Sequence, residues 1–523
     1  MRLRHLPVLA LPLLAAAAPA TSHAQIDAAR RAQALIAGLD YDDARHVLST
    51  ADPDAAEVAL ERARLGIYEL DCDGAAAILA RPEVQKTDEG EQLADIARGC
   101  QRVTAALAVD RDDARGIEVR WQDEHDRALA PLLFDTVAAA RTALTRDLGV
   151  DWPLPTRIVV VRDLLSLSAM TGLPYKSAQT TGTVAVAKWG RVTLLSPRAP
   201  HHGYAWRDTL AHELTHLAVT RASRDQAPLW LQEGVAKREE IRWRDPGPLD
   251  DRPSPDAVVQ RGLELNLGLP LDKLGPSIAM LPSADAAMVA FAEVTSFVRF
   301  YAKESGDDAL PKLLHELRSG KDPDAALQAA SGASLSGWDG RWRAYLAARP
   351  REALPALFGL GGEKTDADKL RDLRDRRRLA ELLLRRSHAP EAVAELDRIA
   401  LVASPSSPEA WDRAMLDPSV RWLRARAMEA AGRREEAKPL VADPKQVLSS
   451  YGPWWAVRGR WSRLAGDEPT ATASFIEAVA ADPFGAEGAC ESIDPGTAPA
   501  DATPAKAALC DAARAAGTEW EGD

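Results

Sequence analysis

The stretch WRDTLAHELTHLAVTRAS, residues 206–223, decides the prediction for the whole chain. His212 and His216 are four residues apart, about one helical turn, so both imidazoles project from one helix face and can hold one tetrahedral cation. Glu213 lies beside them and need not bind the cation, because it can take a proton from a water that the cation acidifies. Apolar residues at helical spacing support the helix, namely Leu210, Leu214, Leu217 and Ala218.

A third protein ligand is expected on the next element, because two histidines leave a tetrahedral site incomplete. The segment LWLQEGVA, residues 229–236, offers Glu233, 17 residues after His216. Residues 224–228 allow the chain to reverse, so an antiparallel second helix can bring Glu233 to the cation. We predict that Glu233 completes a zinc site with the two histidines.

Asp208 precedes His212 by one helical turn, and two interpretations of it stay open. It can orient His212 from behind the metal ligands, or it can be an acidic residue that stabilises the start of a helix.

The length and charge of the chain bound the remaining possibilities. With 523 residues the chain exceeds the roughly 100–200 residues of one domain, so we expect about three folded units. The formal net charge of -12 gives no electrostatic reason to bind a phosphate backbone, which argues against nucleic acid as a partner.

The first residues indicate export. Arg2 and Arg4 precede an apolar stretch at residues 6–20 that is too short to span a bilayer comfortably, and residues 22–24 read Ser-His-Ala, a small-x-small cleavage pattern. No later segment has 18 uninterrupted apolar residues, so we expect no membrane span. The prediction is a signal peptide at residues 1–24 and a periplasmic or secreted product.

The four cysteines fall into two local pairs, Cys72 with Cys100 and Cys490 with Cys510. Two local disulfides suit an exported protein. Four cysteines allow three pairings and sequence cannot show proximity, so simple buried thiols stay open as the alternative.

The rest of the chain divides into three regions by pattern. Residues 25–112 are Ala-rich and helical in period, and we expect paired helices of a repeat there. Residues 115–350 form a second region, with expected strands at 117–121, 157–161, 183–187 and 191–195, the last two joined as a hairpin around Trp189 and Gly190. The repeat in the first region is supported by Ala44, Val47 and Leu48, which are matched about 31 residues later by Ala75, Ile78 and Leu79.

The third region, residues 369–523, is typical of helical repeats. One copy fits most of the spacing of a 34-residue tetratricopeptide unit, and Trp422 lies 33 residues before Trp455, which supports the period. Arg458 stands where leucine is expected, and two packed helices of another kind stay open as the alternative. The residues that fit are Trp455, Gly459, Ala471, Phe475, Ala478 and Pro483.

Five blocks of sequence carry a family resemblance. Together they resemble the peptidase MA-like domain of the gluzincin class, in a form often found with tetratricopeptide repeats in exported bacterial proteins. The resemblance covers about residues 115–349. It implies a small thermolysin-like α+β fold, with His212, His216 and Glu233 as zinc ligands and Glu213 as the general base. The blocks are TGLP at 171–174, TGTVA at 181–185, LSPRA at 195–199, DTLAHELTH at 208–216 and PLWLQEGVA at 228–236.

One position departs from the family. Relatives often carry a tyrosine in a Tyr-Ala-x-x-x-Ser-Phe-Val helix, where this chain has Phe291. Phe291 cannot donate a hydrogen bond to the oxyanion of a tetrahedral intermediate, and losing one such donor typically costs about a hundredfold or more in rate. Candidates for a substitute donor are Tyr175, Tyr204 and Tyr301.

These features predict an exported zinc metallopeptidase that acts on a peptide or protein substrate. The alternative is a peptidase-like scaffold with weak or no catalysis that binds protein partners through its helical repeats. The complete ligand set with Glu213 favours the enzyme, whereas Phe291 favours the scaffold.

Overall fold

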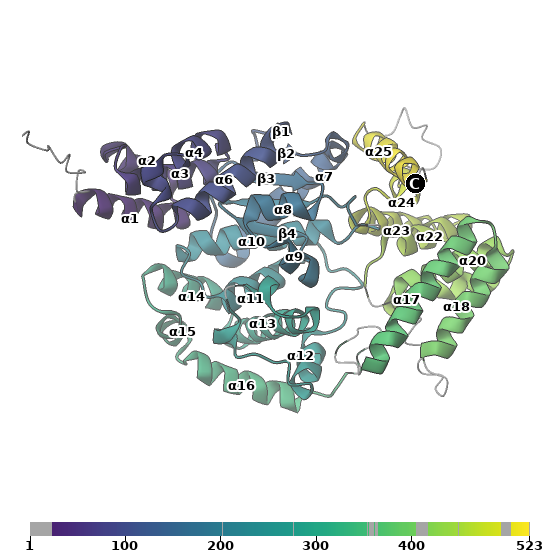
Figure 1. The fold of residues 1–523 in the computed structure, drawn as a ribbon. Helices are drawn as coiled ribbons and strands as arrows, with labels where there is room; N and C mark the ends of the chain where they lie inside the picture. Colours follow the sequence, from purple (N-terminus) through teal and green to yellow (C-terminus); the bar gives the residue numbers. More distant parts are fainter. Residues whose placement is uncertain are drawn as a thin grey trace, which may run out of the picture.

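The structure is a computed structural model that describes residues 23–200, 202–275, 277–352, 354, 360, 364–403, 417–447, 449–492 and 504–521. The chain is mostly helical with one five-stranded sheet, which confirms the predicted α+β class (Figure 1). Only the last two residues of the predicted signal peptide, residues 1–24, fall within the described part. Among the described helices, none has the length and apolar character needed to cross a bilayer.

The sheet is mixed and lies at the centre of the chain. Its spatial order is β1-β2-β3-β5-β4; β2, β3 and β5 run parallel, and β1 and β4 pair antiparallel at the two edges. The inner strands are rich in Val and Ile and are buried on both faces, as expected for strands covered by helices. The strands are β1 (Ala108–Asp112), β2 (Ile117–Trp121), β3 (Thr156–Val161), β4 (Ala185–Lys188) and β5 (Arg191–Leu195).

A two-residue turn joins β4 to β5, as predicted. Trp189 and Gly190 both have left-handed backbone angles, with φ of 57° and 66°, which is the geometry of a tight hairpin turn. This turn makes Lys188 and Arg191 a hydrogen-bonded pair, so the main-chain groups of Ala187 point away from β5. The outer side of β4 is therefore one of the two edges of the sheet.

In the described part of the chain, six helices precede the sheet, and α1 packs against α2 and α3 against α4. The predicted N-terminal helical region extends to residue 112, but residues 108–112 form β1 and belong to the sheet through their pairing with β2. The helices are α1 (His23–Ala37), α2 (Tyr41–Thr50), α3 (Ala56–Glu69), α4 (Cys72–Leu79), α5 (Pro82–Gln85) and α6 (Gly90–Thr104).

The N-terminal helices share a core with the sheet. Ile36 of α1 and Leu65 of α3 belong to the same buried cluster as Val119 and Val192. Arg191 is fully buried beneath them, and its Nη1 donates to the carbonyl oxygen of Ile67 at 2.5 Å. Burial lowers the pKa of Arg191 to about 9, and it forms no ion pair with any described residue. The N-terminal helices thus complete the central domain.

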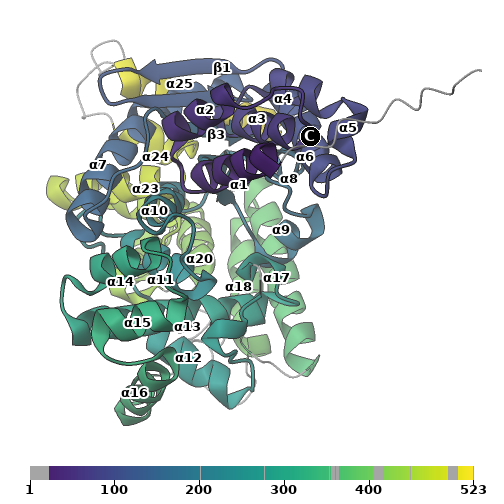
Figure 2. The same ribbon diagram turned by 90° about the vertical axis from the view of Figure 1, so that its left-hand side faces the viewer.

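The central helices surround α10 (Trp206–Ser223), which lies between the sheet and a lower group of helices (Figures 1 and 2). It contacts β4 and β5 on one side and α11 and α14 on the other. The other central helices are α7 (Ala130–Leu148), α8 (Leu164–Thr171), α9 (Tyr175–Thr181), α11 (Leu229–Glu239), α12 (Pro255–Glu264), α13 (Ala284–Ser305), α14 (Ala309–Arg318), α15 (Pro323–Ser331) and α16 (Leu335–Ala348).

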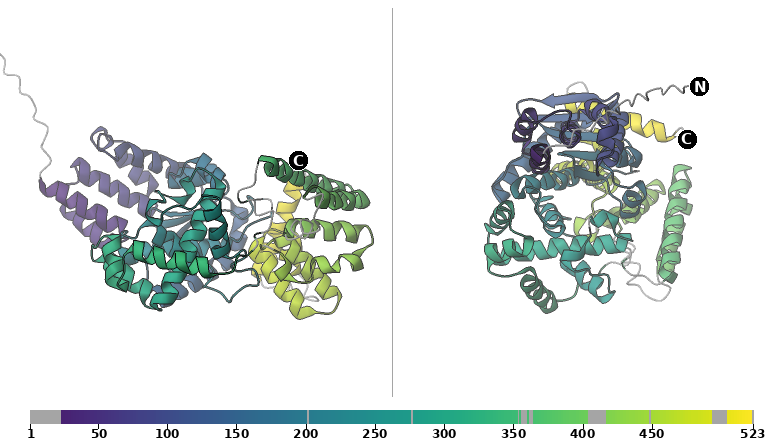
Figure 3. Two further views of the ribbon diagram at one scale, coloured as in Figure 1. Left: turned by 90° about the horizontal axis from the view of Figure 1, so that it is seen from below. Right: turned by 60° about the vertical axis from the view of Figure 1, so that its left-hand side comes forward.

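The C-terminal helices lie on the side of the central domain opposite the N-terminal helices (Figure 3). Within them, α22 and α23 form a close pair: a Cβ on Gly459 would lie 2.8 Å from the ring of Phe475. This close approach is the packing that the repeat prediction requires, and the tetratricopeptide class itself stays a prediction. The longer helices are α17 (Lys364–Arg385), α18 (Ala389–Ala403), α20 (Pro418–Ala430), α22 (Gly452–Leu464), α23 (Glu468–Ala481) and α25 (Pro504–Glu521), with the short α24 (Ala486–Glu491) before α25.

The C-terminal helices dock on the segment that leads into α10. Gly203 has φ of 64°, and a Cβ there would overlap the carbonyl oxygen of Ala481. The ring of His202 packs edge-on against Trp422 and Tyr451, with centroids 5.5 and 5.1 Å away. The segment before the metal-motif helix is thus held by the C-terminal region.

Both cysteine pairs lie at bonding distance. Cys72 at the start of α4 joins Cys100 in α6, with Cα atoms 5.7 Å apart. Cys490 in α24 joins Cys510 in α25, with Cα atoms 4.6 Å apart. The second bond ties the last described helix to the body of the C-terminal region.

Candidate metal centre

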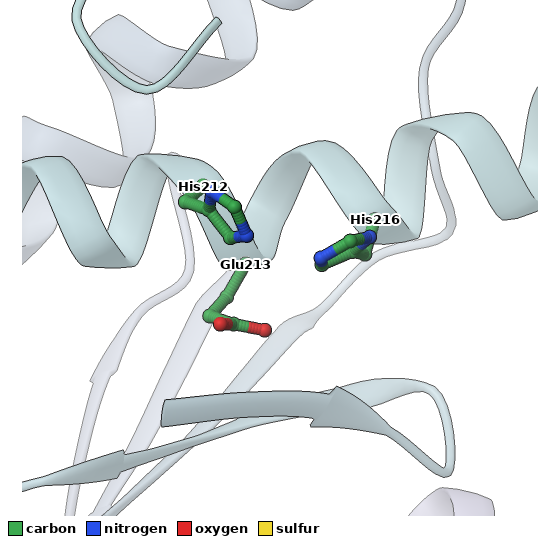
Figure 4. A group of neighbouring side chains, drawn as sticks. All are labelled: His212, Glu213 and His216. Atoms are coloured by element: carbon green, nitrogen blue, oxygen red, sulfur yellow. The ribbon is translucent and has the colours of Figure 1, made fainter. Parts of the chain in front are cut away.

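The two histidines of the H-E-x-x-H motif lie on one face of α10, with their rings directed to the same side (Figure 4). Their ring centroids are 5.0 Å apart, and both side chains are largely buried. Eleven of the 18 residues of α10 are buried, because β4, β5 and neighbouring helices cover it on several sides. The histidines therefore keep a fixed orientation.

Glu233 reaches the histidines from α11, as the sequence predicts. The chain reverses after α10 through Arg224 and Asp225, which both have positive φ. Gly234 then lets α11 lie against α13, because any Cβ there would overlap the side chain of Val298. The result places Glu233 Oε2 3.5 Å from Nε2 of His212 and 3.7 Å from Nε2 of His216.

The donor atoms fit a tetrahedral zinc ion. Ligands at the usual zinc distance of about 2.0–2.1 Å stand roughly 3.3–3.4 Å apart in a tetrahedron. The two separations to Glu233 Oε2 are only slightly longer than that. Two imidazoles and one carboxylate are also a donor set that zinc prefers, with a fourth position left for water or substrate.

Glu213 is the second carboxylate near the histidines. A carboxylate oxygen of Glu213 lies within 4.8 Å of the ring nitrogens, so distance alone also allows it as a ligand. Its Oε2, however, accepts the main-chain N–H of Ala187 at 2.5 Å, and in Figure 4 the side chain points from α10 toward the strands below. Glu233 is the better placed of the two carboxylates to share a cation with the histidines, because one of its oxygens lies near both Nε2 atoms. Glu213 lies beside this group.

A further carboxylate fixes the orientation of His212, and the sequence did not predict it. Glu240 Oε2 lies 3.2 Å from Nδ1 of His212. The other oxygen of Glu240, Oε1, accepts a hydrogen bond from Nζ of Lys237 at 2.5 Å. An Nδ1 hydrogen donated to a carboxylate leaves Nε2 free to bind metal. Gln232 has the same role for His216, with 3.4 Å between Oε1 and Nδ1.

A signal for Glu240 exists in the sequence. It lies seven residues after Glu233, and seven residues are nearly two full helical turns, so both side chains lie on one face of α11. An acidic residue at that spacing from a predicted zinc ligand is a candidate to orient another ligand.

The buried charges of the site are mutually stabilised. Burial acts to lower the pKa of His212, but its hydrogen bonds to Glu233 and Glu240 outweigh burial and raise it to about 10. Burial likewise acts to raise the pKa of Glu240, yet the charges of Lys237 and His212 bring it down to about 2. Burial dominates at Glu213 and raises its pKa.

Asp208 bonds to residues other than His212. Its Oδ1 accepts the indole N–H of Trp243 at 2.9 Å, and Arg244 binds both of its oxygens. Asp208 therefore ties the start of α10 to the segment after α11. The carboxylate that faces Nδ1 of His212 is Glu240.

The three tyrosines named as substitute donors lie in different places. The hydroxyl of Tyr204 donates to the carbonyl oxygen of Leu195, and burial together with the charge of Glu213 raises its pKa. The hydroxyl of Tyr301 donates to Ala309. Tyr175 begins α9 and is 41% exposed. Two of the three hydroxyls are thus already bonded to main-chain carbonyls.

Comparison with known proteins gives one match. The family model of the peptidase MA superfamily matches residues 140–348, the part of the chain that contains α10 and α11. No curated protein and no solved structure matches the chain significantly. The family match supports a peptidase MA-like domain in the centre of the chain and suggests a peptidase hydrolase.

Proposed function

We propose that this protein is an exported zinc-dependent metallopeptidase that hydrolyses peptide bonds. The observation that carries the proposal is the convergence of His212, His216 and Glu233 on one point, with Glu213 beside them. The family match over residues 140–348 supports the peptidase class. The zinc dependence, the role of Glu213 as general base and the export of the protein are parts of this proposal.

The ligands and the base have separate tasks. His212, His216 and Glu233 would hold the zinc, which when bound polarises a carbonyl group and makes water more acidic. Glu213 takes a proton from the attacking water on its carboxylate and then delivers it to the nitrogen of the leaving amine. Burial raises the pKa of Glu213, which brings its basicity closer to what proton transfer near neutral pH requires.

The free edge of β4 gives the substrate a place beside Glu213. The main-chain N–H of Ala187 points away from β5 and reaches the Glu213 carboxylate, so this edge borders the base. An extended peptide can pair with an exposed strand edge through main-chain hydrogen bonds. A substrate bound in this way presents its peptide bonds to Glu213 with little dependence on its side chains.

One observation favours the second candidate function, a catalytically weak scaffold. Phe291 on α13 has no hydroxyl, and Tyr204 and Tyr301 already donate theirs to Leu195 and Ala309. Among the three tyrosines, Tyr175 is then the remaining donor for the oxyanion. In the scaffold, the helical repeats would bind a protein partner.

The two functions separate in one experiment on the purified protein. Zinc content is measured, and cleavage of a broad peptide library is compared between wild type and Glu213→Gln. The peptidase predicts about one zinc per chain and cleavage that falls at least a hundredfold in the variant. Glu316→Gln is the control, because residues 315–316 read His-Glu on α14 but have no second histidine.

Each outcome has a clear meaning. Cleavage that needs Glu213 but not Glu316 supports the enzyme. One zinc per chain without Glu213-dependent cleavage supports the scaffold. A chain that binds no zinc contradicts both.

A further inference from the structure

A cavity of 240 Å³ lies between the central domain and the C-terminal helices. Its walls come from α7, α23 and α25, three elements that meet beside the sheet in Figure 1. Arg207, the second residue of α10, also reaches it, whereas none of the proposed zinc-site residues lines it. The cavity is therefore a separate feature that touches the metal-motif helix only at its first turn.

The walls of this cavity are mainly apolar. Ile476 is 60% exposed, although it is a large aliphatic side chain, and it faces the same space as buried apolar residues. An engineered apolar cavity of about 150 Å³ holds one benzene molecule, so this one has room for about ten heavy atoms. The apolar lining residues include Leu132, Phe475, Ile476, Val479 and Leu509.

Two cations at the cavity form no ion pair with a described residue. Arg207 donates through Nε to Thr136 Oγ1 at 2.8 Å and stacks on Trp243, but it forms no ion pair with any residue that the structure describes. Lys506 has only the carbonyl oxygen of Ser492, 3.4 Å from Nζ. Arg207 and Lys506 thus place two positive charges on one apolar cavity without a direct ion pair to any described residue, and the carboxylates of Asp208 and Asp135 act on Arg207 only from a distance.

The third cation at the cavity, Arg463, differs from the other two because it forms ion pairs. Arg463 forms ion pairs with Glu468 and Glu491, at 3.0 and 3.1 Å. Its charge is thus already balanced by the protein. Burial lowers the pKa of Arg207 more than the charges of Asp208 and Asp135 raise it, so a directly bound anion would stabilise the guanidinium further.

We propose that the cavity binds a small aliphatic carboxylate with about eight to ten heavy atoms. The carboxylate pairs with Arg207, whose planar guanidinium suits two parallel hydrogen bonds, and Lys506 adds a second positive charge. The alkyl chain lies against Phe475 and Leu509 and replaces water there. Because the bound carboxylate contacts α10 and α25 together, it strengthens the attachment of the C-terminal helices to the central domain.

Octanoate is the probe for this site, since it has ten heavy atoms and one carboxylate. Calorimetric titration of the full chain should give saturable binding to one site, and thermal unfolding should move to higher temperature as octanoate is added. Two comparison compounds separate the contributions: 1-octanol keeps the chain without the charge, and acetate keeps the charge without the chain. Both should bind at least tenfold more weakly than octanoate.

Two exposed positions give a matched pair of variants. Ile476→Asp places a negative charge in the cavity wall and should weaken octanoate at least tenfold by repulsion. Leu464→Asp makes the same change at the end of α22, where the residue is 65% exposed and outside the cavity, and should bind octanoate like wild type. Exposure of both positions keeps the variants folded.

A third variant tests the charged end of the cavity. Arg207→Gln should reduce octanoate affinity toward that of 1-octanol. If Arg207→Gln unfolds, the comparison of Ile476→Asp with Leu464→Asp tests the proposal instead. The proposal is overturned if octanoate and 1-octanol bind equally, if Ile476→Asp binds like Leu464→Asp, or if millimolar octanoate does not bind. Because none of these measurements uses catalysis or zinc, a failure here leaves the proposed peptidase function unaffected.

Discussion

Glu240, directly after α11, contacts a proposed metal ligand from behind. Its carboxylate holds Nδ1 of His212, and Lys237 holds the carboxylate in turn. Removing such a partner typically costs tenfold to a hundredfold in metal affinity. We expect Glu240→Ala to lower zinc affinity by this amount and Glu240→Gln to restore part of it, as measured by competition with a chromophoric chelator.

Asp208 supplies the control for Glu240. It lies one turn from His212, but its partners are Trp243 and Arg244. Asp208→Asn should therefore lower the unfolding temperature and leave zinc affinity within about threefold of wild type. Equal losses of zinc affinity in the Asp208 and Glu240 variants would contradict the separate roles assigned to the two carboxylates.

Glu293 on α13 makes the stability of the central domain depend on pH. It is fully buried, and its Oε2 accepts the N–H of Leu269 at 3.1 Å. Burial raises its pKa to about 7, so the folded chain holds a proton that the unfolded chain releases near pH 4.5. Stability contributed by this protonated carboxyl is complete below about pH 4.5 and is lost as the pH rises toward 7 and above.

Glu293→Gln should remove that loss, because the amide stays neutral and its oxygen can still accept the N–H of Leu269. The variant should exceed wild type in stability at pH 8 by on the order of 2 kcal/mol and should differ little at pH 5. Calorimetric unfolding at the two pH values measures this. A stability difference that is equal at pH 5 and pH 8 would rule out the titration of Glu293 as the cause.

The residues that could be predicted from the sequence are those with a fixed local spacing. His212, Glu213 and His216 follow from one helical turn, and Glu233 follows from the reversal after α10. Glu240 was missed because its spacing from Glu233 makes it only one candidate and does not show which ligand it contacts. Its contact with His212 depends on the angle at which α11 crosses α10, which is set by tertiary packing.

At the scale of elements, the hairpin of β4 and β5 connects the sheet to the proposed chemistry. The N–H of Ala187, on the outer side of β4, donates to the Glu213 carboxylate and so holds the proposed base beside this strand edge. Ala187→Pro removes this N–H at an edge position, where proline is tolerated. We expect kcat/KM for a peptide substrate to fall at least tenfold while zinc affinity stays unchanged.

Ala187→Val is the matched variant, since it keeps the N–H and adds bulk at the same place. It should retain most of the wild-type kcat/KM, measured on the same peptide. If the proline variant were as active as the valine variant, the N–H of Ala187 would have no part in catalysis or substrate binding.

Elements with strong local patterns were predicted well, and weak ones were not. The hairpin was predicted because Trp189 and Gly190 separate two apolar strands. β1 was assigned to the N-terminal helical region, because its sequence, Ala-Val-Asp-Arg-Asp, has little apolar character. Its strand conformation comes from pairing with β2, which sequence patterns do not reveal.

At the scale of the whole molecule, the close contact at Gly203 controls how the C-terminal helices sit on the central domain. Gly203→Val would push its side chain into the main chain at Ala481. We expect this variant to loosen the docking, seen as a larger radius of gyration in X-ray scattering and faster trypsin cleavage of the C-terminal region. Gly203→Val should lower zinc affinity by less than Glu240→Ala does.

Gly149 provides the control for backbone strain. Its φ of 65° nearly equals that of Gly203, but a Cβ there would meet nothing within 4 Å. Gly149→Val should therefore lower the unfolding temperature without changing the radius of gyration. Equal expansion in both variants would show that strain, and not the contact with Ala481, loosens the molecule.

The division of the chain into regions was predicted in outline only. The sequence patterns separate helical ends from a mixed centre, and the structure has the same order. The patterns did not reveal that the N-terminal helices and the sheet form one buried cluster. Burial by a distant segment leaves no periodic signal of its own, because each helix shows only that one of its faces is apolar.

The buried guanidinium of Arg191 sets a practical limit on how the protein can be shortened. A fragment cut at residues 115–350, the natural choice for recombinant expression of the proposed peptidase domain, would lack Ile67, whose carbonyl oxygen accepts from Arg191. Without the N-terminal helices, the Arg191 guanidinium would be exposed to solvent on the side that they now bury, and it has no carboxylate partner among the described residues. Such a fragment should aggregate, and a soluble form of the proposed peptidase domain has to include α1, which begins at His23.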